Sequence, residues 1–249
     1  MDIINYSGVT KKYNSWPMGN NVLALDCFSL KIEQGEVFGF LGPNGAGKST
    51  ALKMLLNFIY PDTGTVTLMG RSVSDRRARD LVGYLPENPY FYDYLTAEEV
   101  LWFGGKASGL PKQKIHERSE MLLHRMGLLS ASKRPLRTYS KGMVQRAGLA
   151  LALIHDPEVV VLDEPMSGLD PIGRKLVGDL ILELKSRNKT VFFSSHILTD
   201  VEQFCDRAGI IVGGRLRLVG GLADLLSGEN TLENVFMREV HAAGGGEAI

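Results

Sequence analysis

Apolar and polar positions change their spacing along this 249-residue chain. Residues 3–10, 24–32 and 65–68 alternate or run apolar without helices between them, which indicates an antiparallel flap of strands. Residues 159–162 and 190–193 are short apolar runs, typical of strands buried on both faces. Since such strands alternate with helical patterns, the sequence predicts an α/β fold with a mainly parallel sheet beside the flap.

A helical pattern interrupts the strands in the middle of the chain. Thr96 and Glu99 have the spacing of a capping box and precede apolar residues at helical spacing. We therefore expect an inserted α-helical subdomain over about residues 88–157, within a single domain of residues 1–230. Residues 231–249 are expected to form a short C-terminal helix and a flexible tail.

A phosphate-binding loop lies between an apolar strand and a helical pattern. It consists of Gly42, Pro43, Asn44, Gly45, Ala46, Gly47, Lys48, Ser49 and Thr50. The glycines let backbone N–H groups turn toward phosphates, Lys48 can reach the outer phosphates, and the Ser49 hydroxyl can ligate magnesium. The following helix would point its N–H groups and its dipole at the same phosphates. The chain is expected to bind a nucleoside triphosphate.

Polar residues follow both buried strands, at the strand ends where open α/β sheets bind ligands. Asp163 can hold magnesium through water, while Glu164 can polarise a water in line with the γ-phosphate. His196, one of five histidines, could hydrogen-bond the γ-phosphate and the attacking water. The predicted catalytic residues are Glu164, His196 and Lys48.

A second helix start has the character of an anion-binding site. Ser140 is placed as an N-cap, and Gly142 permits close approach to the backbone. Taken alone, these residues fit an ordinary capped helix more readily, since Ser is a favoured N-cap.

Composition limits the classes of protein that fit. The chain has 28 basic and 28 acidic residues, which argues against a dedicated nucleic-acid binder. The longest apolar run, residues 147–154, is far shorter than the roughly 20 residues of a membrane-spanning helix. The N-terminus resembles no secretory signal, so a cytoplasmic protein is expected. Cys27 and Cys205 lack metal-ligand spacing and are expected to be buried apolar residues.

Together these features resemble the ATP-binding subunit of ABC transporters over about residues 3–225. The matching segments are the P-loop at residues 42–50, Ser140, Lys141 and Gly142 at the signature position, the Walker B strand at 159–164, the D-loop at 167–170, the switch histidine His196, and Tyr13 as the adenine-stacking aromatic. The resemblance implies a P-loop NTPase core of the RecA type that binds ATP with Mg²⁺ and hydrolyses ATP.

The resemblance also implies a mechanism that needs two subunits. Each ATP would lie between the P-loop of one subunit and Ser140 and Gly142 of the other, in a homodimer or with a paralogous ATPase subunit. ATP binding would close the pair, and the helical subdomain would pass the motion to transmembrane permease subunits. The protein would then be peripheral on the cytoplasmic face of the inner membrane.

Three departures from the family pattern affect these expectations. Glu87 replaces the usual glutamine; as a carboxylate it can still sense magnesium or its water, so we expect Ser49, Glu87 and Asp163 at the metal. Lys141 and Met143 replace the commonest glycine and glutamine. These signature changes and the C-terminal helix resemble the subfamily that pairs with separate six-helix permeases and exports drugs, polysaccharides, lipids or other hydrophobic cargo.

The third departure is a longer loop over residues 14–22, after Tyr13. It contains Trp16, which could compete with Tyr13 as the adenine platform, since stacking needs only a placed aromatic face.

The aromatic run at residues 89–94 has two interpretations. Its rings could pack the core of the helical subdomain, or some, such as Tyr90 and Tyr92, could line a groove for a partner's helix.

Two other functions remain as alternatives. A soluble ABC-type ATPase acting on ribosomes or DNA would usually carry two cassettes or long coiled-coil inserts, and neither is present in this sequence. A P-loop kinase would need an acceptor pocket and would not explain the residues from Ser140 to Arg146.

Overall fold

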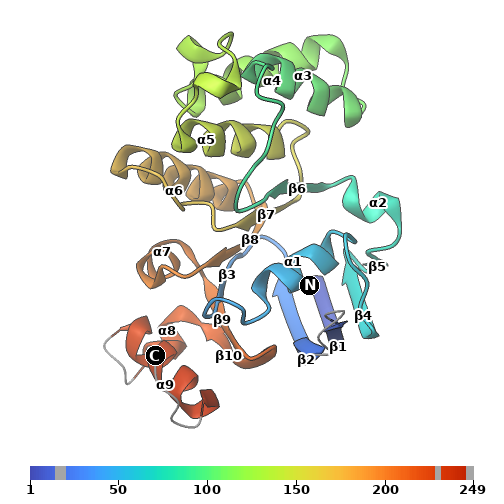
Figure 1. Ribbon diagram of the computed structural model, residues 1–249, viewed down its shortest axis with the longest axis vertical. Coiled ribbons are helices and arrows are strands. Elements are labelled where there is room, and N and C mark those ends of the chain that lie inside the picture. The colour runs from blue at the N-terminus through green and yellow to red at the C-terminus, as the bar shows by residue number, and fades with distance from the viewer. Residues whose placement is uncertain (15–20, 228–230, 245–249) are drawn as a thin grey trace. The chain divides into compact units, whose positions relative to one another are not determined.

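The computed structural model describes residues 1–14, 21–227 and 231–244 (Figure 1). The chain forms two compact units, one of Met1–Arg79 with Thr190–Ile249 and the other of Asp80–Lys189. Within the described ranges, no helix combines the length and the apolar character needed to cross a membrane. The predictions for Trp16 and for the tail after Gly244 lie outside the described residues.

The first unit contains the predicted antiparallel flap. Its strands are β1 (Asp2–Asn14), β2 (Asn21–Glu33), β4 (Thr63–Leu68) and β5 (Arg71–Ser72), in the order β2-β1-β4-β5. All pairs in this sheet are antiparallel. Tyr6 and Phe28 pack edge to face, 5.2 Å between ring centroids, so aromatic side chains fill the space beneath the flap.

A second group of strands in the first unit runs mainly in parallel. It comprises β3 (Val37–Leu41), β8 (Thr190–Ser195), β9 (Arg207–Val212) and β10 (Arg215–Gly221), in the order β10-β9-β3-β8. β3 pairs in parallel with β8 and β9, and β10 is antiparallel to β9. Every residue of β3 and β8 is buried, as their apolar sequences predict. The helices of this unit are α1 (Lys48–Leu55), α2 (Arg76–Arg79), α7 (Leu198–Phe204), α8 (Leu222–Leu225) and α9 (Leu232–Gly244).

The second unit combines one parallel strand pair with helices. The strands are β6 (Val82–Leu85) and β7 (Val159–Asp163). The helices are α3 (Ala97–Ala107), α4 (Lys112–Arg125), α5 (Lys141–Ala152) and α6 (Pro171–Ser186), with short 3₁₀ turns η1 (Leu129–Ala131) and η2 (Leu136–Thr138). The predicted class, α/β with mainly parallel strands and a helical subdomain, is confirmed.

The capping box predicted at the start of α3 is present. The Glu99 N–H donates to Thr96 Oγ1 at 3.2 Å, and the Thr96 N–H donates to Glu99 Oε2 at 2.8 Å. These reciprocal bonds satisfy donors that a helix start otherwise leaves open, so the sequence locates this helix start correctly.

The prediction that both cysteines are buried is wrong. Cys27 is exposed and Cys205 is only partly buried. The register of β1 with β2 shifts between the pairs Val9 with Phe28 and Lys11 with Leu25, and Cys27, with φ of 45°, lies in this bulge. A bulge reorients the side chains of the bulged strand, so simple alternation gives the wrong face for Cys27.

His155 should make the stability of the fold depend on pH. Its Nε2 lies 3.1 Å from the Val82 carbonyl oxygen, and burial lowers the pKa of the ring from its ordinary 6.5. The fold favours the neutral ring, so His155 does not reduce the stability of the fold above pH 6.5. As the pH falls below 6.5, the unfolded chain binds a proton at His155 more readily than the folded chain, and the unfolding free energy falls. The unfolding free energy of the wild type, from urea titrations at pH 7.5 and 5.5, should therefore fall more than that of His155→Gln. Equal falls, with exposed His116→Gln as the control, would contradict this account.

Candidate nucleotide-binding site

The loop between β3 and α1 leaves the first N–H groups of α1 without a side-chain cap. Gly47 occupies the N-cap position with φ of 109°, and no side chain hydrogen-bonds to the helix start there. The N–H groups at a helix start need acceptors, and a phosphate supplies them. The loop therefore has the local geometry of an anion site.

Two glycines of the loop are required by close packing of the backbone. A Cβ atom at Gly47 would overlap the carbonyl oxygen of Ala24 in β2, and one at Gly42 would lie 2.5 Å from the carbonyl oxygen of Ile211 in β9. The positive φ of Gly47 would also strain any other residue. Close packing thus explains glycine at these two positions.

The Lys48 side chain folds back over the loop. It is only 8% exposed, and its Nζ donates to the carbonyl oxygens of Gly42 and Pro43, the latter at 3.2 Å. An ammonium held over the loop is well placed to attract an anion. Ser49 and Thr50 follow in the first turn of α1 and are half-buried. These residues fit the polyphosphate of a nucleotide.

His196 reaches the same strand edge as the loop. β3 and β8 are parallel, with Leu41 paired to Ser195, so Gly42 and His196 each follow the last paired residue at the same carboxyl end. His196 is exposed. The sequence predicts both residues at strand ends, and the register brings these two ends together.

Tyr13 lies on the hairpin that supports the loop. It pairs with Val22 of β2, two residues before Ala24, whose carbonyl oxygen faces Gly47. The Tyr13 side chain is 39% exposed, with the Lys11 ammonium 5.7 Å from its ring centroid. Its ring is therefore accessible near the loop, as adenine stacking requires.

In the second unit, Asp163 and Glu164 lie at the end of β7. They are 5% and 8% exposed, so both carboxyl groups are buried. Glu164 has φ of 51°, a left-handed conformation that is unfavourable for a glutamate, and its carbonyl oxygen accepts the N–H of Ser167 at 3.1 Å. Backbone strain of this kind concentrates at functional sites.

Glu87 follows the neighbouring strand β6. Leu85 of β6 pairs with Leu162 of β7 in parallel, so Glu87 and Asp163 lie beyond the same strand end. Burial and the charge of Asp163 raise the pKa of Tyr84 to about 12. Among the described residues, no cluster of three or more His, Cys, Asp or Glu side chains forms a metal site.

The start of α5 carries the predicted Ser140 cap. Ser140 is exposed, and its Oγ accepts the Met143 N–H at 3.2 Å. Gln145 was not predicted as a site residue; it is 1% exposed and donates from Nε2 to the Pro165 carbonyl oxygen at 3.4 Å. This bond joins α5 to the loop that follows Glu164. Gln145 is a polar residue on the buried face of an otherwise apolar helix, and this position could have indicated its role from the sequence.

Lys141 contacts the turn predicted as the D-loop. A Cβ atom at Gly168 would lie 3.0 Å from Lys141 Cε and 3.1 Å from its Cδ, so the lysine stem lies along this turn. Gly168 has φ of 70°, which favours glycine. Gly142 also faces the turn, since its Cβ position is 3.4 Å from Leu169 Cδ2. The helix start and the turn form one packed surface.

A phosphate-binding loop and buried carboxylates at strand ends on an α/β fold define a P-loop nucleotide-binding protein. Residues 25–167 match the model of the ABC transporter family. An uncharacterized ABC transporter ATP-binding protein of Synechocystis is 51% identical over 220 residues, which cover 88% of this chain and 62% of that relative. The bacitracin transport ATP-binding protein BcrA of Bacillus licheniformis is 41% identical over 217 residues, covering 86% of this chain and 68% of BcrA.

A solved structure described as the ATP-binding subunit of an ABC transporter superposes with a TM-score of 0.85 and 26% identity. The superposition covers 95% of this chain and 99% of that one. The chain belongs to the ABC transporter family, and it carries the ATPase domain of that family. The predicted resemblance is confirmed.

Substitution of two loop glycines should separate backbone strain from steric overlap. Gly45 has φ of 78° and no atom within 4 Å of its Cβ position, whereas Gly47 combines a positive φ with overlap of Ala24. We expect Gly45→Ala to weaken ATP binding about fivefold or less, from about 1 kcal/mol of strain. Gly47→Ala should abolish measurable binding by calorimetry. Similar affinities for both variants would show that the packing around Gly47 does not shape the site.

Proposed function

We propose that this chain is the ATP-hydrolysing subunit of an ABC transporter, with residues 1–230 as the ATPase domain and a separate permease in the membrane. The observation that carries the proposal is the uncapped helix start behind Gly47, with Lys48 folded over it. Such a loop binds triphosphates. Family membership supports the assignment.

Each polar group of the site has a proposed task in binding. The loop N–H groups and Lys48 bind the β- and γ-phosphates, and Tyr13 stacks on the adenine. Hydroxyl and carboxylate oxygens are the ligands that Mg²⁺ prefers, and Ser49, Glu87 and Asp163 offer them. Mg²⁺ bound there would neutralise charge on the β- and γ-phosphates.

Hydrolysis needs a base and a group that stabilises charge. Glu164 accepts a proton from the attacking water while the water oxygen bonds to the γ-phosphorus and the bond to the β-bridging oxygen breaks. ADP and phosphate are the products. His196 donates a hydrogen bond to the γ-phosphate and stabilises its negative charge in the transition state. The strained backbone at Glu164 supports a functional assignment for this carboxylate.

The exposed start of α5 supports a dimer. Ser140 is exposed beside the half-buried Gly142 at a helix start, a position that suits an anion. We propose that two copies pair head to tail, so that Ser140 and Gly142 of one copy complete the ATP site of the other. ATP then favours the closed dimer because it contacts both copies.

Exposed tyrosines support a membrane partner. Tyr90, Tyr92 and Tyr94 are 89%, 65% and 61% exposed, which supports the interface interpretation of this run over packing in the core. We propose that the permease docks here and that the ATPase is therefore peripheral on the cytoplasmic face of the inner membrane. We propose that the cargo is exported; similarity to BcrA, named for bacitracin transport, supports a role in transport. No observation favours a ribosome- or DNA-directed ATPase.

Replacing Glu164 by Gln tests its proposed role as the base. We expect ATP turnover to fall roughly 100-fold or more, because glutamine cannot accept the proton. ATP binding should persist, so the variant should accumulate as an ATP-bound dimer in size-exclusion chromatography. The exposed Glu233→Gln is the matched control and should keep wild-type turnover. Wild-type hydrolysis by Glu164→Gln would remove Glu164 from this role.

The double substitution Tyr90→Ala with Tyr92→Ala tests the permease contact. Since both rings are exposed, the unfolding free energy and the basal ATPase rate should change little. Stimulation of the ATPase by the reconstituted permease should be lost. The control is Tyr60→Ala, because Tyr60 is 63% exposed and lies in the other unit. Full stimulation of the double variant by the permease would show that the permease docks on another surface.

A further inference from the structure

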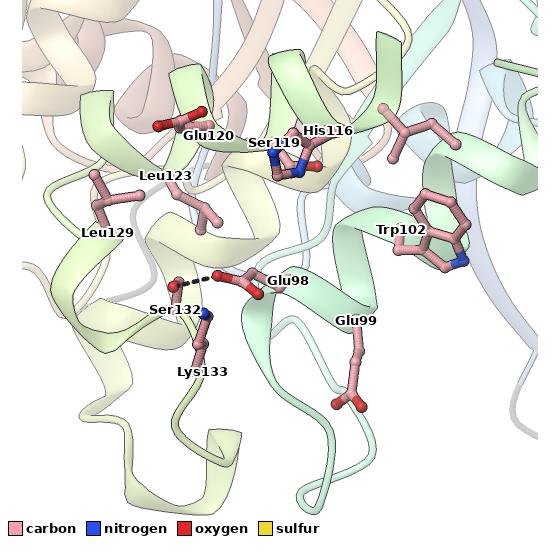
Figure 2. A pocket seen from close by; sticks show the side chains of 11 residues that line it. Glu98, Glu99, Trp102, His116, Ser119, Glu120, Leu123, Leu129, Ser132 and Lys133 are labelled. Atoms are coloured by element: carbon pink, nitrogen blue, oxygen red, sulfur yellow. Dashed lines mark hydrogen bonds between the residues drawn. The ribbon is translucent and has the colours of Figure 1, made fainter. Parts of the chain in front are cut away.

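The helical part of the second unit contains a pocket that nucleotide binding does not use. It has a volume of about 560 Å³ and lies between α3, α4 and the segment from η1 to Lys133 (Figure 2). Its walls combine glutamates with apolar and aromatic side chains. Its lining residues include Glu98, Trp102, Ser119, Glu120, Leu123 and Lys133.

The charge of the pocket is acidic. Glu98, Glu99 and Glu120 line it, against the basic residues Lys133 and His116. Glu98 accepts the Ser132 hydroxyl at 2.6 Å, which fixes its carboxylate at the pocket wall, as Figure 2 shows. Glu120 is exposed at the edge. Carboxylates held around a hollow of this kind favour a cation.

A buried hydroxyl provides a second, independent indication of a ligand. Ser119 of α4 is 8% exposed and lines the pocket. Its Oγ is one of the buried polar atoms that find no hydrogen-bond partner in the part of the chain that the structure describes. A buried hydroxyl without a partner costs about 1–3 kcal/mol, and a donor entering the pocket would recover that cost.

The remaining wall suits the stem of a long side chain. Leu123 and Ile115 are buried, while Trp102 is 40% exposed. The Trp102 ring already faces one cation, the Lys106 ammonium, at 5.5 Å from its centroid. An arginine combines an apolar stem with a planar cation that stacks on aromatic rings and bonds carboxylates in pairs. Its N–H groups could donate to Glu98, Glu120 and Ser119, which line the pocket.

We propose that this pocket receives an arginine side chain from the cytoplasmic segment of the permease. The proposal rests on the proposed function for the existence of that partner. The exposed tyrosine run leads directly through Leu95 into Thr96, the cap of α3, so the proposed docking surface continues into the pocket wall. The Leu136 N–H donates to the Leu95 carbonyl oxygen at 2.8 Å and joins this run to the segment after Lys133.

The first experiment tests the chemistry of the pocket without the permease. Trp16→Phe leaves Trp102 as the single tryptophan, since the chain has two. In this background, the indole N–H signal of Trp102 is followed by NMR during titration with N-acetyl-arginine methylamide. The neutral citrulline analogue is the control ligand. We expect a saturating shift with arginine and at least about threefold weaker binding of citrulline.

Two variants identify the acceptors. Glu120→Gln should weaken arginine binding about three- to fivefold, while Glu117→Gln on the same helix should leave it unchanged, since Glu117 does not line the pocket. Ser119→Ala should weaken binding without lowering the melting temperature, because it removes an unsatisfied hydroxyl. If Ser119 were purely structural, Ser119→Ala would lower the melting temperature and leave arginine binding unchanged. Equal binding of arginine and citrulline, or no shift, would overturn the proposal even if the chain hydrolyses ATP normally.

The second experiment tests the occupant in the purified complex with the permease. A photo-crosslinking residue, p-benzoylphenylalanine, replaces Trp102, or Met121 as the control; Met121 is 45% exposed on α4 and does not line the pocket. We expect position 102, and not 121, to crosslink to a permease peptide that contains an arginine. Crosslinks from position 102 to a second copy of this chain, or none in an intact complex, would contradict the assigned occupant. Failure to form any complex would instead count against the proposed function.

Discussion

The close approach of the β2 backbone to Gly47 is the constraint on which the nucleotide site depends. The Ala24 carbonyl oxygen leaves no space for a side chain at this position. On the other side of the helix start, buried Tyr6 donates its hydroxyl to the Ala51 carbonyl oxygen at 2.9 Å and anchors α1 to the flap. The loop is therefore held from two strands of the flap before any ligand binds. Preorganised N–H groups lose little freedom on binding a phosphate.

The second unit links the carboxylates to the helix start that we propose as a dimer contact. Gln145 ties α5 to the segment after Glu164, and Lys141 lies along the turn at Gly168. A shift of the α5 start would thus displace the segment next to the strained Glu164 backbone. This packing gives a physical route from the proposed dimer contact at Ser140 to the proposed base. Closely packed interfaces do not deform continuously, so we expect these contacts to switch between two arrangements.

Much of this structure follows from local sequence patterns. The capping box at Thr96, the cap at Ser140 and the buried strands depend on neighbouring residues, and each is as predicted. Features that depend on distant contacts were missed. The exposure of Cys27 comes from a bulge set by pairing with β1, and the role of Gln145 comes from a contact 20 residues away. The sequence left two interpretations of the tyrosine run, and only the folded chain shows that its rings are exposed.

We propose that each chain carries two incomplete halves of an ATP site, which a second copy completes. Mixing two inactive variants tests it directly. Lys48→Ala removes the loop cation, and Ser140→Arg blocks the helix start, so neither homodimer should hydrolyse ATP. Mixed dimers contain one intact site, and random exchange should restore up to about a quarter of wild-type turnover. If the mixture stays inactive after subunit exchange, or if Ser140→Arg alone is fully active, the claim is wrong.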